Sequence, residues 1–202
     1  MEKGRWWNNR VVYQVYPISF NDSNGDGIGD IKGIIEKIDY FKFLGVGAIW
    51  LNPIYDSPND DMGYDIRDYE KIQKIYGTNE DFKELLKKLH DNNIKLIMDL
   101  VVNHSSDEHK WFIESKKGKD NPYHDYYIWN SSDKNTRPSN LASFFTPSAW
   151  KYCDQAKQWY LHLFSEKQPD LNWENQNLRN DIFKMINNKW FFITLGVHGI
   201  PF

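Results

Sequence analysis

Residues 94–102 read IKLIMDLVV, a nearly continuous apolar run that contains one acidic residue, Asp99. A run of this kind is typical of a strand that is buried on both faces near the centre of a parallel sheet. Two polar residues follow it, Asn103 and His104. Parallel α/β folds gather their binding and catalytic groups at the carboxyl ends of strands. The run therefore predicts both a parallel sheet and the edge at which a site forms.

The sequence before this run alternates between strand and helix patterns. We predict strands over 11–20 and 46–51, and a helix within 31–45 whose apolar residues form one stripe. Thr78 can cap a second helix, with Asp81 three positions later as its capping-box partner. The order strand, helix, strand, helix, strand predicts βα units wound right-handed into a parallel sheet.

After Val102 this alternation stops. Residues 103–175 are polar, rich in Trp and Tyr, and contain four prolines, which indicates an irregular insertion and not another βα unit. Apolar periodicity from Leu178 to Ile186 marks a third helix, and a fourth strand could begin near Gly196. We therefore divide the chain into 1–103 (three βα units), 104–175 (insertion) and 176–202 (third helix and start of strand four).

Composition excludes several classes of partner. The chain has 202 residues, 40 % of them apolar and 26 % charged, and a net charge of −3, which argues against nucleic acid or an anionic membrane. Cys153 is the only cysteine, so no intrachain disulfide can form. The N-terminus lacks the apolar segment of a secretory signal, and the apolar run 190–202 is shorter than the roughly 20 residues of a spanning helix. We expect a cytoplasmic protein.

Residues 22–30 read DSNGDGIGD, which has the oxygen-ligand spacing of the first nine positions of an EF-hand loop. The position of the closing glutamate is Gly33, and the loop follows a predicted strand instead of a helix. Hard oxygen ligands at this spacing can bind Ca²⁺, or Mg²⁺ with waters. The alternative is a Gly/Asp/Asn turn that binds no ion. Any ion here would have a structural role.

Two further stretches, 99–104 and 57–69, lie at or beyond the carboxyl ends of predicted strands. A charged Asp99 inside a buried strand requires a partner, and with His104 it could belong to a site; a locally capping aspartate and a surface histidine are the alternative. The segment 57–69, SPNDDMGYDIRDY, mixes carboxylates such as Asp61 with Tyr64. Such carboxylates can hydrogen-bond the hydroxyls of a sugar while the aromatic ring stacks on it. The alternative is an acidic loop that only contacts solvent.

Taken together, four stretches resemble the α-amylase superfamily of glycoside hydrolases. VYQVYPISFNDSNGDGIGD, SPNDDMGYDI, DLVVNHSSDEHKWF and QPDLNWEN occur in the order and spacing of that family, over about residues 6–190. Within it they are similar to the oligo-1,6-glucosidase and α-glucosidase branch. The resemblance implies the N-terminal part of a (β/α)8 TIM barrel, with a domain B inserted after strand three.

The resemblance also implies roles for individual residues. Asp61 would hydrogen-bond the non-reducing glucose of a short α-gluco-oligosaccharide, Tyr64 would stack on it, and His104 would bind a hydroxyl of the same ring. Asp99 would pair with an arginine of strand four. The implied ligands of the structural Ca²⁺ or Mg²⁺ are Asp22, Asn24, Asp26, the carbonyl of Ile28, and Asp30.

Catalytic residues are not among these matches. A retaining glycosidase needs two carboxyl groups about 5 Å apart. The resemblance places the nucleophile just after strand four and the acid on strand five, whereas the terminal LGVHGIPF matches the strand-four motif poorly: Ile200 stands for Phe and Pro201 for Arg. We expect no hydrolysis of α-glucosides by this chain alone. An open, apolar barrel edge would favour self-association.

Three functions stay open at this point. The first is a fragment of a retaining α-glucosidase that acts on short α-glucans. The second is a non-catalytic carbohydrate- or metal-binding half-barrel, and the third is an N-terminal subunit completed by another chain. QPDLN favours α-1,6 over α-1,4 linkages slightly, and sucrose isomerase or trehalose-forming relatives share the motifs.

Overall fold

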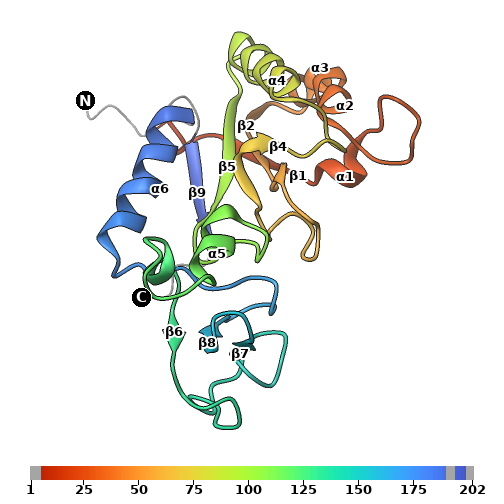
Figure 1. The fold of residues 1–202 in the computed structure, drawn as a ribbon. Coiled ribbons are helices and arrows are strands. Elements are labelled where there is room, and N and C mark those ends of the chain that lie inside the picture. The colour runs from red at the N-terminus through yellow and green to blue at the C-terminus, as the bar shows by residue number, and fades with distance from the viewer. Residues whose placement is uncertain (1–5, 190–193, 199–202) are drawn as a thin grey trace. The chain divides into compact units, whose positions relative to one another are not determined.

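The computed structural model describes residues 6–189 and 194–198, and the chain divides into two compact units (Figure 1). Unit 1 comprises 1–54, 71–100 and 192–196, and unit 2 comprises 55–70, 101–191 and 197–202. Residues 199–202, which include part of the predicted fourth strand and the degraded strand-four motif, lie outside the described residues. The division predicted from sequence at 103/104 and 175/176 stays a prediction.

The predicted parallel sheet is present. Its strands are β1 (Val11–Val15), β2 (Val46–Leu51), β5 (Lys95–Val101) and β9 (Thr194–His198), in the order β1-β2-β5-β9. β1 pairs with β2, and β2 with β5, both in parallel. The first strand is shorter than predicted. Residues Pro17–Phe20 form the one-turn helix α1, because proline fits the first position of a helix and cannot donate to a strand ladder.

Helices of unit 1 follow the predicted apolar stripes. The predicted helix within 31–45 is divided into α2 (Ile31–Glu36) and α3 (Ile38–Phe43), since Lys37 has non-helical φ and ψ of −96° and 9°. Helix α4 (Asn79–Asp91) has the predicted capping box between Thr78 and Asp81. Helix α2 packs on α4, and α3 contacts β2. The core of the unit is formed by fully buried side chains, among them Ile31, Ile34, Phe41, Ile49, Leu51, Leu85 and Leu89.

Unit 2 contains the predicted insertion, which is more regular than expected. Ahead of the insertion, unit 2 contains β3 (Tyr55–Asp56), which pairs with β4 (Asp68–Ile72), whose last two residues belong to unit 1. Short elements follow: α5 (Lys110–Ser115), the 3-10 helix η1 (His124–Tyr126), β6 (Trp129–Asn130), β7 (Trp150–Cys153) and β8 (Gln158–Leu161). The last three form an antiparallel sheet in the order β6-β8-β7. Strands of two to four residues are too short to show a period of two in sequence.

The third predicted helix is α6 (Gln176–Lys189), whose residues Leu178 and Ile182 are buried as its apolar pattern indicates. Among the helices that the structure describes, none combines the length and the apolar character needed to cross a bilayer.

Two glycines allow the loop after β1 to pack tightly on its neighbours. A Cβ on Gly33 would lie 1.9 Å from the backbone oxygen of Asn21, and one on Gly29 would lie 2.0 Å from that of Pro17. Both distances are far below van der Waals contact, and in each case the obstacle is backbone, which cannot move like a side chain. The close approach of chain segments therefore requires glycine at both positions.

We predict that Gly33→Ala lowers the free energy of unfolding by about 2–3 kcal/mol, because the added methyl group forces Asn21 and α2 apart. Urea unfolding followed by circular dichroism measures this loss. Gly45→Asn is the matched control: Gly45 has a φ of +70° and no atom within 4 Å of its Cβ position. It should cost only the left-handed backbone strain, about 1 kcal/mol. Equal losses in the two variants would contradict the packing argument.

Candidate functional site

The loop between β3 and β4 is organised by one buried carboxylate. Asp65 is fully buried and accepts hydrogen bonds from Ser57 Oγ (2.9 Å) and from the backbone N–H groups of Asp60 (2.9 Å) and Asp61 (3.0 Å). A buried charge is tolerated when such donors replace water. Asp65 therefore holds the backbone of Asp61 in place.

An ion-pair network lies at the base of the same loop. Arg67 donates from Nε and Nη2 to the two oxygens of Asp56 (2.8 and 2.9 Å), a bidentate arrangement, and from Nη1 to Glu108 Oε2 (2.9 Å). These hydrogen bonds, chiefly those to Asp56, raise the pKa of Arg67 above its ordinary value. The guanidinium thus links the two ends of the loop to the segment after β5.

Asp61 of this loop meets two polar side chains from other segments of unit 2, Gln168 and His104. Gln168 Nε2 donates to Asp61 Oδ2 at 2.8 Å and lies 3.1 Å from His104 Nε2. Gln168 is fully buried, and its Oε1 accepts from the backbone of Ser165 (3.0 Å), which fixes the orientation of the amide. Burial raises the pKa of Asp61, and the hydrogen bond from Gln168 opposes that rise.

The protonation of His104 follows from its neighbours. Its Nε2 lies 3.2 Å from the backbone oxygen of Tyr64, which can only accept, so Nε2 carries the proton. Its Nδ1 accepts from Asn103 Nδ2 at 3.3 Å. Burial lowers the pKa of His104 to about 4, so the ring is neutral near pH 7. The short distance between His104 Nε2 and Gln168 Nε2 is then not a hydrogen bond, because both nitrogens are donors: His104 donates to the Tyr64 carbonyl and Gln168 to Asp61.

A second acidic group lies close to this cluster. Asp170 is buried, and its Oδ1 accepts from the backbone of Leu163 (3.0 Å) and from Asn103 Nδ2 (3.3 Å). Burial raises the pKa of Asp170 to about 7, against the effect of these two hydrogen bonds. Asn103 therefore joins the His104 ring to a carboxyl group that titrates close to neutrality.

Aromatic rings border the polar cluster. The Phe164 ring lies 5.0 Å from that of His104 and stacks on Phe144 at 5.1 Å, with Phe145 edge-on at 6.0 Å. Phe144 and Phe145 are largely exposed. A carboxylate, an amide and a neutral imidazole beside apolar ring faces can hold a polyhydroxylated ring, which presents hydroxyl edges and C–H faces.

The residues predicted from sequence divide between the two units. Asp61, His104 and the backbone of Tyr64 come together in unit 2, whereas Asp99 belongs to unit 1. Asp99 is fully buried, and Trp50 Nε1 donates to its Oδ1 at 2.7 Å, which supplies the partner that a buried aspartate requires. The arginine partner of Asp99 and the individual binding roles stay predictions.

Sequence reasoning missed three members of the cluster: Phe164, Gln168 and Asp170. Gln168 and Asp170 belong to the QPDLN stretch, which in the sequence supports the family resemblance and a slight preference for α-1,6 linkages. Their burial decides their role, and a single sequence does not show that polar residues of an irregular segment are buried. Phe164 carries no signal among the many aromatics of the insertion.

Loop 22–30 of unit 1 is held by its own backbone. Asp22 accepts from the N–H groups of Asn24, Gly25 and Gly27 (3.1, 2.7 and 2.7 Å), and the bond from Gly27 contributes most to the lowered pKa of Asp22. Asp30 caps α2 by accepting from Gly33 N. Among the residues that the structure describes, no three acidic, histidine or cysteine side chains gather as they would around an ion.

The chemistry of this donor set nevertheless suits a hard cation. Asn24 Oδ1 and Asp26 Oδ1 each accept one backbone N–H, at 2.9 and 2.8 Å, and an sp² oxygen has two lone pairs. These oxygens keep a lone pair that could face an ion. The loop therefore provides the type of ligand atom that a hard cation prefers, and the presence of an ion stays a prediction.

Comparison with known proteins shows close relatives. The family model described as "Alpha amylase, catalytic domain" matches residues 14–200. An oligo-1,6-glucosidase from Bacillus cereus is 57 % identical over 199 residues, which are 98 % of this chain and 35 % of that protein. The crystal structure of an isomaltulose synthase from Protaminobacter rubrum matches with a TM-score of 0.92 and 52 % identity, over 96 % of this chain and 35 % of that one.

A third similar structure carries a sugar. It is a mutant isomaltulose synthase from Erwinia rhapontici in complex with its natural substrate sucrose, with a TM-score of 0.92 and 52 % identity over 98 % of this chain and 35 % of that chain. The present chain thus spans about a third of the length of the proteins that it matches.

The raised pKa of Asp170 leads to a pH prediction. The pKa of Asp170 in the folded chain, about 7, exceeds its ordinary value of 3.8. The contribution of the protonated Asp170 carboxyl group to folding stability is therefore complete below about pH 3.8 and is lost as the pH rises through 7. We expect wild type to lose stability relative to Asp170→Asn over this window, by on the order of 2–4 kcal/mol. Urea unfolding of both proteins at several pH values between 4 and 8 measures the difference, and a difference that stays constant with pH would contradict the assignment.

Proposed function

This chain belongs to the α-amylase family, and from that premise we propose that it is the part of an α-glucosidase that binds the non-reducing glucose of a short α-gluco-oligosaccharide. The observation that carries this proposal is the cluster in which Gln168 donates to Asp61 beside the neutral ring of His104. The resemblance of these positions to glucose-binding residues of the family supports it.

Each member of the cluster has a defined task in this proposal. The Asp61 carboxylate accepts hydrogen bonds from sugar hydroxyls, and Gln168 keeps its orientation. The neutral His104 ring contributes to binding without placing a second charge beside the sugar. The ring of Tyr64 stacks on the apolar face of glucose. Asp65, through its hydrogen bond from the Asp61 backbone, positions the group that binds.

The reaction of the whole protein is proposed on the same basis. We infer that it hydrolyses α-1,6-linked gluco-oligosaccharides with retention, a reaction that uses one carboxylate as nucleophile and a second carboxyl group as acid and base. The relative from Bacillus cereus bears an oligo-1,6-glucosidase name, which supports α-1,6 over α-1,4 linkages. The resemblance assigns neither catalytic group to residues 1–202, so the role proposed for this stretch is binding.

A second candidate follows from the solved structures. The similar isomaltulose synthase from Erwinia rhapontici is in complex with sucrose, its natural substrate. Sucrose also presents a terminal α-glucosyl ring, so the same cluster would hold it. The two candidates differ in which disaccharide binds more tightly.

We predict that isomaltose gives a saturable isotherm in titration calorimetry with this chain, and that Asp61→Asn weakens binding about tenfold or more, because a charged acceptor is replaced by a neutral one. The matched control is Asp60→Asn at the adjacent position. Asp60 donates to Asp65 through its backbone N–H, which the substitution retains. Tighter binding of sucrose than of isomaltose would favour the second candidate. Equal affinities of wild type and Asp61→Asn would contradict the site.

For loop 22–30 we propose a structural Ca²⁺ or Mg²⁺ site. The residues that would hold the ion are Asp22, Asn24, Asp26, the carbonyl of Ile28, and Asp30. A bound cation would offset the repulsion among the carboxylates of one short loop, and its role would be to stabilise the connection between β1 and α2.

We expect calcium at about 100-fold excess over its dissociation constant to stabilise the folded chain by about 2.7 kcal/mol, measured as a rise in Tm that EDTA reverses. Asp26→Asn should reduce this rise, since it removes one charge and retains an oxygen that can accept the backbone N–H of Ile28. A Tm that responds to neither Ca²⁺ nor Mg²⁺ would show that the loop is a turn without an ion.

A further inference from the structure

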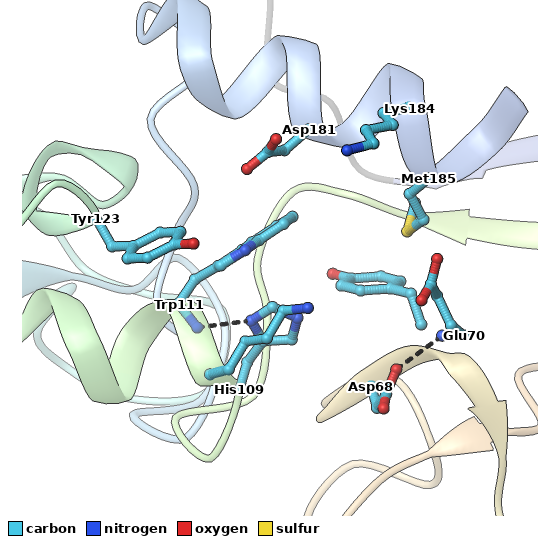
Figure 2. Close-up of a pocket in the computed structure, with 10 residues that line it drawn as sticks. Asp68, Glu70, His109, Trp111, Tyr123, Asp181, Lys184 and Met185 are labelled. Atoms are coloured by element: carbon cyan, nitrogen blue, oxygen red, sulfur yellow. Dashed lines mark hydrogen bonds between the residues drawn. The ribbon is translucent and has the colours of Figure 1, made fainter. Parts of the chain in front are cut away.

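Unit 2 contains a cavity of about 370 Å³ that shares no residue with the Asp61, His104 and Gln168 cluster. Its volume lies within the roughly 300–1,000 Å³ typical of sites for small molecules. Figure 2 shows side chains of β4, of the α5 segment and of α6 around it. It is lined by Asp68, Tyr69, Glu70, His109, Lys110, Trp111, Tyr123, Asp181, Lys184 and Met185.

Aromatic rings form the buried part of its wall. Tyr69, His109 and Trp111 are each no more than 6 % exposed. The ring of His109 lies 4.5 Å from that of Trp111 and 5.6 Å from that of Tyr69, so the three rings form one packed group. Such a group is rigid because each ring is held by its neighbours.

His109 supplies a hydrogen-bond donor for which the described residues provide no acceptor. Its Nδ1 accepts from the backbone N–H of Trp111 at 3.1 Å, as the cap of α5, and the neutral ring therefore carries its proton on Nε2. Burial lowers the pKa of His109 to about 3, so the ring stays neutral at ordinary pH. His109 is 2 % exposed, and in the part of the chain that the structure describes no hydrogen bond involves Nε2. His109 is one of the residues that line the cavity.

Other polar atoms of the wall are also open to a ligand. Within the described residues, neither Trp111 Nε1 nor the Tyr123 hydroxyl forms a hydrogen bond with the protein. Asp181 accepts from the Tyr126 hydroxyl with Oδ2 at 2.8 Å, which leaves Oδ1 as an acceptor. Figure 2 shows Asp181 facing Trp111 and Tyr123 from α6. Donors and an acceptor therefore surround the same space.

The charges around the cavity narrow the class of ligand. The residues that line it include three with carboxylates, Asp68, Glu70 and Asp181, and two with ammonium groups, Lys110 and Lys184. A small cation would meet several N–H and O–H donors, and an anion would meet the carboxylates. A neutral polyol can donate to the carboxylates, accept from the donors, and lay its C–H face on an aromatic ring.

We propose that this cavity is a second saccharide-binding site, which takes a neutral mono- or disaccharide against Trp111 and Tyr123. The indole N–H of Trp111, Nε2 of His109 and the Tyr123 hydroxyl donate to sugar oxygens. Asp181 accepts from a sugar hydroxyl. The choice of an α-glucoside as probe rests on the proposed function, whereas the chemistry of the cavity does not.

The test follows the indole N–H resonances of ¹⁵N-labelled chain during titration with isomaltose. Trp111→Phe identifies the Trp111 resonance. We expect this resonance to shift and saturate, and Tyr123→Phe to raise the dissociation constant read from it about fivefold, as the loss of one hydrogen bond of about 1 kcal/mol requires. Asp181→Asn should have a similar effect. The matched control is Tyr152→Phe in β7, outside the cavity, which should leave the dissociation constant unchanged.

A Trp111 resonance that stays unshifted up to saturation of the Asp61 site would overturn the proposal. So would a shift that neither Tyr123→Phe nor Asp181→Asn weakens. Asp61→Asn separates this result from the proposed function: it should weaken the calorimetric isotherm of the first site and leave the Trp111 titration as in wild type. Circular dichroism of each variant confirms that the fold is retained.

Discussion

Burial of strand β5 is the constraint on which the arrangement of this chain depends. Its residues Leu96, Met98 and Val101 are at most 2 % exposed, in a sheet where β2 pairs on one side and β9 is next in order on the other. A strand covered in this way has room for few polar groups along its length. The exception, Asp99, is compensated by the indole of Trp50. Polar chemistry accordingly concentrates in the residues that follow the strand, beginning with Asn103 and His104.

The same physical effect sets the electrostatics of unit 2. Desolvation makes His104 and His109 neutral and raises the pKa values of Asp61 and Asp170. The buried polar groups therefore act mainly as neutral donors and oriented acceptors. This character suits a ligand that is polar and uncharged, and it is shared by the Asp61 cluster and by the cavity lined by Trp111.

Prediction from sequence worked where the signal is local or periodic. The strand 46–51, the strand predicted over 94–102 and observed over 95–101, the helix after Thr78 and its capping box are all confirmed, since each depends on side chains within a few residues. Prediction from sequence failed where the local backbone conformation departs from the apolar pattern. Pro17 begins a helix, so the first strand ends early, and Lys37 divides a predicted helix into two. Of the candidate site, the sequence predicts Asp61 and His104, which the structure brings together, but it does not predict Gln168 and Asp170.

The sequence by itself determined the order of the βα units, the edge where polar residues gather, and the family to which the chain belongs, because periodicity and ordered motifs are properties of neighbouring residues. Only the tertiary structure decided that Gln168 orients Asp61, that Asp65 anchors the loop that carries Asp61, and that His109 lines a cavity with an N–H for which the described residues provide no acceptor. Those contacts join residues from separate segments, and it is the burial produced by folding that sets their protonation and their donor or acceptor roles.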